Sequence, residues 1–214
     1  MASLLPVSVT PLIGSPIAGR LADRVGPRIP MTIGPAVAGG GLLLAAATAH
    51  VPSYWTSIFP AVVILAVGLA LTVAPLTTAV LSALGPDRAG IASGVNSALS
   101  RFGGLVAVAI LPALSLVGFS HGLEHRLSTA QVDPGVRAAI VADRAEQGAL
   151  SPPADLPADE RALIREAVRQ SFSDAFRWVM LVCALLLFAG AGISFLELRP
   201  TARAPDQRAS SDAS

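Results

Sequence analysis

Long apolar stretches separated by short polar turns run along most of this chain. They cover residues 2–18, 31–49, 58–84, 96–118 and 178–198. A membrane-spanning helix needs about 20 mostly apolar residues, so each stretch predicts one transmembrane helix. The first is the weakest, because Pro6, Pro11 and Pro16 interrupt it. Partner helices can accommodate such prolines. The pattern therefore predicts an all-α integral membrane protein with about five spans, four of them within residues 1–118.

A polar segment of residues 119–177 separates the fourth and fifth stretches. Asp133 followed by Pro134 predicts a helix start, with aspartate at the N-cap and proline at the first position. Gly148 predicts the end of that helix. A second helix is predicted from Pro157, and it can continue into the last span. Its apolar stripe suits a lid, a partner site, an interfacial helix or, most simply, packing on its own neighbour. The stripe consists of Leu163, Ile164, Val168, Phe172, Ala175 and Phe176.

Composition and charge support a membrane protein. The chain is 53% hydrophobic and 14% charged, whereas soluble domains carry about a quarter charged residues. All cations are arginine, the net charge is +1, and the absence of any basic tract argues against a nucleic-acid partner. The lone Cys183 cannot form an intrachain disulfide, and a free cysteine in an apolar run is usually a small hydrophobe.

The distribution of arginine predicts the orientation. Arg20–Arg28 and the tail 199–214, which is predicted to be disordered, fall on one side of the membrane, while the arginine-free turn His50–Thr56 falls on the other. The positive-inside rule makes the first side cytoplasmic. We therefore expect a multi-pass protein of the plasma (inner) membrane with a cytoplasmic C-terminus. Residues 119–177 also carry arginines, but long loops translocate largely regardless of charge.

The predicted spans hold few groups with special chemistry. A helix kink is predicted at Pro75. The neighbouring threonine hydroxyls and Gly68 either line a central cavity or have a purely structural role, in which the hydroxyls bond to their own backbone. Arg101, the deepest cation, is a candidate for gating or for a structural role. The predicted kink and cavity-lining residues are Gly68, Thr72, Pro75, Thr77 and Thr78. The predicted spans contain no Asp or Glu between the interfaces.

The sequence does not indicate a catalytic site or a metal site. His121 and His125 have the spacing of a metal pair, but only Glu124 stands near as a third ligand. We therefore predict no metal, no cofactor and no enzyme activity. The small-residue stripes, such as Gly39–Gly41 with Ala45, are interpreted as helix-packing surfaces and not as a nucleotide loop.

The turn between the first two stretches resembles the signature loop of the major facilitator transporters. The matching positions are Gly19, Leu21, Ala22, Asp23, Arg24, Gly26 and Arg28. A second stretch, Gly90–Gly104, resembles the fourteen-helix drug–proton antiporters of the multidrug exporter type, as does Gly68–Thr78. The resemblance implies a cytoplasmic latch loop formed by Gly19, Asp23, Arg24, Gly26 and Arg28.

The resemblance also implies a function. The five spans would be the last five helices of a drug or secondary-metabolite exporter, which is proton-coupled in its full length. We expect the chain to be a fragment that is inactive alone. Its expected partners are the lipid bilayer, a small apolar or cationic substrate, and either the missing N-terminal half or a second copy of the chain. The alternative is a non-transporting, membrane-anchored protein whose extracytoplasmic segment binds a partner.

Overall fold

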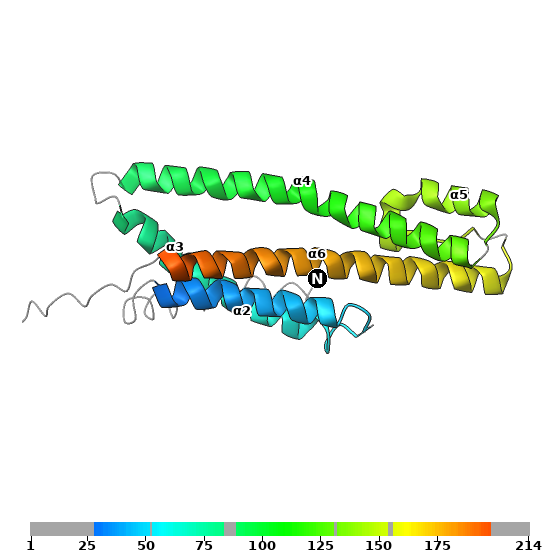
Figure 1. Cartoon of the computed structure of the whole chain (residues 1–214), viewed down its shortest axis with the longest axis horizontal. Helices are drawn as coiled ribbons and strands as arrows, with labels where there is room; N and C mark the ends of the chain where they lie inside the picture. Colours follow the sequence, from blue (N-terminus) through cyan, green and yellow to red (C-terminus); the bar gives the residue numbers. More distant parts are fainter. Residues whose placement is uncertain (1–27, 52, 84–88, 131, 154–155, 198–214) are drawn as a thin grey trace, which may run out of the picture.

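The described part of the chain is entirely helical. The computed structural model describes residues 28–51, 53–83, 89–130, 132–153 and 156–197. Within these ranges there is no strand, which confirms the predicted all-α fold; residues 2–18 lie outside them. The elements are α2 (Arg28–Ala47), α3 (Ile58–Ala83), α4 (Ala89–Thr129), α5 (Pro134–Ala142), the short 3₁₀ helix η3 (Arg144–Ala149) and α6 (Ala158–Glu197) (Figure 1).

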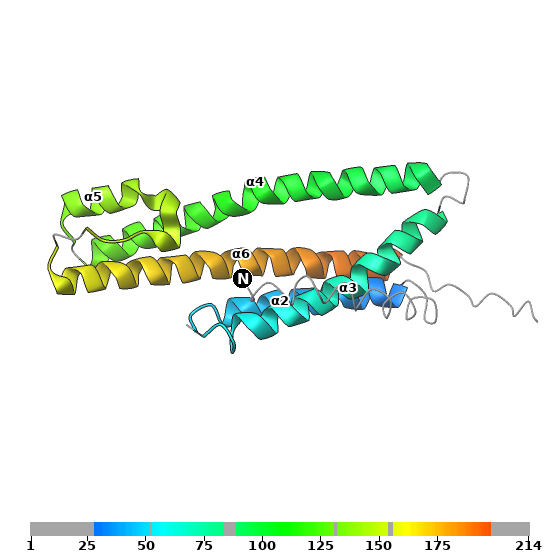
Figure 2. The same cartoon turned by 180° about the vertical axis from the view of Figure 1, so that it is seen from behind.

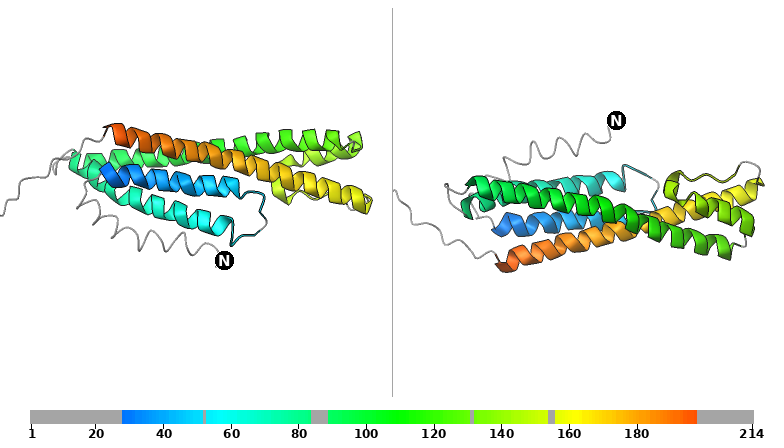
Figure 3. Two further views of the ribbon diagram at one scale, coloured as in Figure 1. Left: turned by 60° about the horizontal axis from the view of Figure 1, so that its bottom comes forward. Right: turned by 90° about the horizontal axis from the view of Figure 1, so that it is seen from above.

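The helices α2 and α3 form an antiparallel pair that also packs on α6 through α2 (Figures 1 and 3). Their ends agree closely with the predicted ranges 31–49 and 58–84. Two aromatic rings of the connecting turn neighbour a third at the start of α3, with the Trp55 ring centroid 5.7 Å from that of Tyr54 and 5.2 Å from that of Phe59. Trp55 is 72% exposed. Such amphipathic rings are typical of the membrane–water interface.

The helices α4 and α6 are about twice as long as a bilayer requires. They have 41 and 40 residues and so measure about 60 Å each, against a hydrocarbon core of about 30 Å. The predicted span 96–118 lies within α4, which begins at Ala89 and ends at Thr129 and so extends beyond the span at both ends. Hydropathy falls after Gly118, but the helix continues because its next turns find a packing partner in α6. The predicted continuity from Pro157 into the last span is confirmed, since α6 is unbroken.

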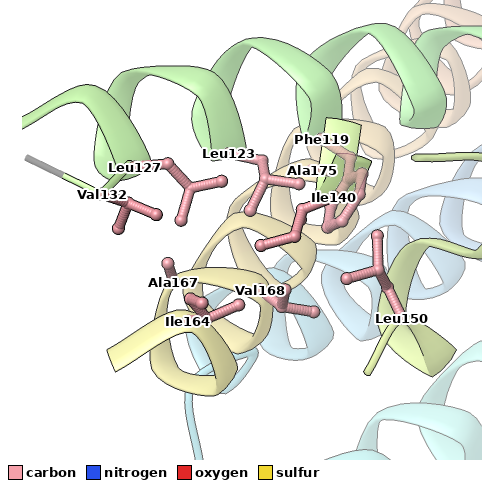
Figure 4. Packing of buried hydrophobic residues seen from close by; sticks show 10 residues of the cluster. All are labelled: Phe119, Leu123, Leu127, Val132, Ile140, Leu150, Ile164, Ala167, Val168 and Ala175. Carbon is pink, nitrogen blue, oxygen red and sulfur yellow. The ribbon is translucent and has the colours of Figure 1, made fainter. Parts of the chain in front are cut away.

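The polar segment folds into a small body with its own hydrophobic core. We call residues 119–130, 132–153 and 156–177 the hairpin module, because it is built on the antiparallel ends of α4 and α6 (Figure 2). Side chains from α4, α5 and α6 meet in it, together with two from the connecting segments, Val132 before α5 and Leu150 after η3 (Figure 4). The buried members are Phe119, Leu123, Leu127, Val132, Ile140, Leu150, Ile164, Ala167, Val168 and Ala175. Three residues of the predicted stripe on α6, Ile164, Val168 and Ala175, therefore pack on the neighbouring elements of the module. Leu163 and Phe172 are exposed instead.

The connection between α4 and α6 begins as predicted and ends differently. Asp133 caps α5, because its Oδ1 accepts hydrogen bonds from the backbone N–H groups of Gly135 at 2.8 Å and Val136 at 3.3 Å. The predicted end at Gly148 is wrong, since α5 ends at Ala142 and η3 follows. Gln147 breaks helical geometry with φ 46°, and its Oε1 accepts a 3.0 Å hydrogen bond from Ser115 Oγ of α4. This bond holds η3 against α4.

The other halves of the long helices expose apolar surface. Three described helices, α2, α4 and α6, contain stretches long and apolar enough to cross a membrane, and α3 has a shorter apolar stretch over Ile58–Val73. The most apolar window of α4 is only 6% buried, and that of α6 is 11% buried. Surface of this kind on a folded chain requires lipid or further protein to cover it.

Candidate functional site

Most of the predicted latch loop lies outside the described residues. This applies to Gly19, Asp23, Arg24 and Gly26, whereas Arg28 is the first residue of α2. The role of the loop therefore stays a prediction. Pro75, Thr77 and Thr78 belong to the second half of α3, which the backbone continues through to Ala83; their roles also stay predictions.

Gly68 and Thr72 lie in a very close contact between α3 and α2. A Cβ added at Gly68 would lie 2.7 Å from Ala38 Cα, and one added at Gly34 would lie 3.0 Å from the Gly68 carbonyl oxygen and against Thr72 Oγ1. The Thr72 hydroxyl donates a 2.8 Å hydrogen bond to the Gly68 carbonyl of its own helix. Gly68 and Thr72 thus pack against α2, and the described structure gives them a packing role.

The close contact continues along α2. A Cβ added at Gly41 would lie 2.7 Å from the Leu65 backbone nitrogen and 2.8 Å from the Ala61 carbonyl oxygen. On the next face, a Cβ added at Gly39 would meet the Phe188 ring of α6 at 3.0 Å. The predicted glycine run therefore serves two helix interfaces. Its continuation to Gly34 was missed, although small residues three and four positions apart are its signal.

Arg101 stands on the exposed surface of α4. It lies about 18 Å along the helix from Ala89. Among the described residues, no side chain forms an ion pair or hydrogen bond with its guanidinium. An unpaired charge at membrane depth costs a few kcal/mol. The described residues therefore show neither a partner nor a role for Arg101, and both its gating role and its structural role stay predictions.

A crossing of small residues joins α4 to α6 at the base of the hairpin module. A Cβ added at Gly118 would lie 3.7 Å from Ala175 Cβ, and one added at Gly122 would lie 3.4 Å from Ser171 Oγ. Ser171 and Ala175 are buried. The spacing of Gly118 and Gly122 is the glycine-x-x-x-glycine pattern that lets helix backbones approach. Sequence analysis missed this crossing, although the pattern was present.

A polar cluster sits beside this crossing and connects three elements. We call His50, Arg126, Gln170 and Asp174 the polar junction. Arg126 donates from Nη2 to Asp174 Oδ2 at 2.6 Å and from Nε to Gln170 Oε1 at 3.2 Å. The other carboxylate oxygen of Asp174 lies 3.5 Å from His50 Nε2, in the turn after α2. Asp174 of α6 therefore faces both α4 and the α2–α3 turn.

A second ion pair lies on the exposed side of α6. Arg169 donates to both carboxylate oxygens of Glu166, at 2.8 Å from Nε and 2.5 Å from Nη2. These bonds, with one from Gln170, lower the pKa of Glu166 to about 2 and raise the pKa of Arg169. Both groups face water, so the pair contributes little to stability. The Glu166–Arg169 pair therefore belongs to the solvent-exposed surface of the module.

His121 and His125 line one open surface pocket together with Glu124 and Arg137. Over the described residues, no group of three or more His, Cys, Asp and Glu side chains is arranged to hold a metal ion. The cationic Arg137 beside the histidines also disfavours a metal there.

The arrangement defines a multi-pass, all-helical membrane protein with a polar helical module at one end. The sequence profile of the Major Facilitator Superfamily matches residues 1–121, more than half of the chain. The chain therefore belongs to this superfamily, whose members are membrane transporters and not enzymes.

Named relatives resemble the chain over most of its length. The multidrug resistance protein Stp of Mycobacterium tuberculosis is 31% identical over 196 residues, which is 86% of this chain and 35% of the relative. The tetracenomycin C resistance and export protein of Streptomyces glaucescens is 26% identical over 95% of this chain and 38% of the relative. A triacylglyceride transporter of Mycolicibacterium smegmatis is 30% identical over 85% of this chain and 32% of the relative. The chain spans about a third of the length of these relatives.

Proposed function

We propose that this chain forms the C-terminal membrane part of an exporter for apolar or cationic drugs or secondary metabolites. The observation that carries this proposal is the likeness, over most of the chain, to a multidrug resistance protein and to a tetracenomycin C resistance and export protein. Export is proton-coupled in the complete transporter. Substrate binds between two halves near the bilayer midplane, as in other transporters built from repeats.

In this proposal the loop Arg20–Arg28 and the tail 199–214 face the cytoplasm, and the hairpin module faces outward. The arginine-rich loop supports this orientation through the positive-inside rule. The lengths of α4 and α6 support a projecting module, because about 30 Å of each helix exceeds what the hydrocarbon core holds. The turn after α2, with Trp55, then lies at the outer interface.

The proposed partners are the lipid bilayer and the N-terminal transporter half, or a second copy that takes its place. The apolar surface of α4 and α6 supports this, since Leu105 is 71% exposed, Val108 75% and Leu196 79%. The predicted spans contain no carboxylate between the interfaces. A proton-coupling group must therefore come from another part of the transporter, and the chain alone is inactive.

The cytoplasmic loop is proposed to act as a latch between helices that separate during transport. Asp23 can accept hydrogen bonds at a helix N-terminus, and Arg24 can bind carboxylates or lipid phosphates. Pro75 is proposed to kink α3, because proline removes one backbone hydrogen bond.

Dye efflux tests the proposal. The chain is co-expressed with the N-terminal part of the Streptomyces glaucescens relative in cells that lack their own drug pumps. We expect efflux only when both parts are present, and weaker efflux with Asp23→Asn or Pro75→Ala. Absence of efflux while the complete relative exports the same dye would favour the partner-binding alternative, and unchanged efflux in both variants would refute these role assignments.

A further inference from the structure

Near the hairpin module, α6 packs against α4 on one side and against the α2–α3 turn on the other, and the two interfaces differ in how completely they are packed. The interface with α4 is well packed, because the buried Ala175 and Ser171 lie within ordinary van der Waals range of Gly118 and Gly122. The core of the hairpin module continues it beyond this crossing (Figure 4). Well-packed interfaces of this kind move as one unit, since separating them exposes apolar side chains.

The interface with the α2–α3 turn is loosely packed. A cavity of about 110 Å³ lies there, lined by Ala45, Ala49 and Ser57 on one side and by Phe172, Ser173 and Phe176 on the other. Further along the same pair of helices, Gly39 packs directly against Phe188. The α2–α6 contact is therefore close at Gly39 and incomplete at the turn.

Asp174 stands between these two interfaces. Its Oδ2 is held by Arg126 at 2.6 Å, within the well-packed unit. Its Oδ1 faces His50 Nε2 at 3.5 Å, across the loosely packed interface. The carboxylate is thus fixed by α4 and offers its second oxygen to the turn.

We propose that Asp174 is a positioning residue for transport, and that the His50–Asp174 contact is the one that opens when the turn end of the α2–α3 pair moves away from α6. Regions with few buried apolar contacts open locally at the lowest free energy, and the cavity marks such a region at the turn end of this interface. The hairpin module and α6 then stay together, while the turn separates from them. This inference rests on the proposed function, but the opening itself can be measured without transport.

The first test compares thiol labelling at two serines of α6. Ser173 lines the cavity, whereas Ser171 is fully buried on the α4 side. In a Cys183→Ser background, a membrane-impermeant maleimide is added to the chain in vesicles. We expect Ser173→Cys to react about tenfold faster than Ser171→Cys, because labelling requires local opening. Equal rates would overturn the inference.

Variants at the junction decide whether Asp174 controls this opening. Asp174→Asn is expected to speed the labelling of Ser173→Cys by about threefold or more, because a neutral amide holds both partners less strongly. Asp174→Glu should restore the original rate, and Glu124→Gln, which removes an exposed carboxylate from the same module, should not change it. Equal effects of Asp174→Asn and Glu124→Gln would contradict the proposed role.

Cross-linking then connects the opening to transport. A short, reducible bis-thiol reagent joins Ala49→Cys to Ser173→Cys across the cavity in the co-expressed transporter, which leaves His50 and Asp174 intact. The control joins Ser115→Cys of α4 to Gln147→Cys of η3, where the native side-chain oxygens lie 3.0 Å apart. We expect about a tenfold loss of efflux for the first pair, reversed by reduction, and little change for the control. Unchanged efflux in a fully cross-linked first pair would refute the inference. Absence of efflux in every variant would instead refute the proposed function, and the labelling rates would still decide the opening.

Discussion

The contact between α2 and α3 predicts opposite outcomes for two neighbouring glycines. A Cβ added at Gly41 would lie 2.7 Å from the Leu65 backbone nitrogen, whereas one added at Gly40 would have nothing within 4 Å. Ordinary contact with a Cβ begins at 3.4 Å. The backbone of α3 must therefore retreat from α2 in Gly41→Ala and need not move in Gly40→Ala.

The magnitude follows from two terms. Replacing glycine by alanine inside a helix stabilises by about 1 kcal/mol, and this term is common to both variants. Overpacking costs about 1–3 kcal/mol, and only Gly41→Ala incurs it. The difference between the two variants isolates the packing term. At about 2–4 °C per kcal/mol for a chain of this size, Gly41→Ala should melt roughly 2–12 °C below Gly40→Ala.

Thermal unfolding of the purified chain in detergent, followed by far-ultraviolet circular dichroism, measures this difference. Both variants carry the same side chain on the same helix, so expression, charge and helix propensity are matched. Equal melting temperatures, or a lower value for Gly40→Ala, would show that α2 and α3 do not approach as closely as the structure has them.

Three further predictions concern other parts of the chain. Leu123→Ala should destabilise the hairpin module by about 2–5 kcal/mol, measured by amide hydrogen exchange, whereas Leu163→Ala, at a side chain that is 40% exposed, should cost much less; equal losses would contradict the described core. Arg101→Gln should slow dye efflux in the co-expressed transporter if the cation gates, and unchanged efflux would leave Arg101 a structural role. Hydrogen bonds from Arg169 and Gln170 lower the pKa of Glu166 from 4.5 to about 2, so the small stabilising contribution of this exposed contact is fully present above pH 4.5 and is lost as the pH falls through 2. The melting temperature of Glu166→Gln should therefore be slightly less sensitive to pH in that range, and an identical dependence would argue against the contact.

Local sequence signals predicted the helices well where they act within one segment. Asp133 and Pro134 start α5 as expected, because capping involves only neighbouring backbone groups. The continuity of α6 followed from an unbroken helical pattern between Pro157 and Glu197. The end of α5 was predicted incorrectly, because the chain bends into η3 where Ser115, far away in the sequence, binds Gln147.

Contacts between distant segments were not accessible from one sequence. Phe119 and Ile164 share a core although the sequence places them 45 positions apart, and no local pattern pairs them. The same holds for Arg126 with Asp174, which periodicity cannot distinguish from other surface charges. The predicted close packing of small residues was correct for Gly41, but the crossing at Gly118 and Gly122 required knowledge of which helix lies opposite.

In the proposed topology the apolar helices cross the plasma membrane with the arginine loop inside and the hairpin module outside. Single cysteines at Arg24 and Glu124, each in a Cys183→Ser background, test it directly with a membrane-impermeant maleimide on intact cells. We expect labelling of Glu124→Cys at once and of Arg24→Cys only after permeabilisation. Labelling of Arg24→Cys in intact cells, with Glu124→Cys protected, would contradict it.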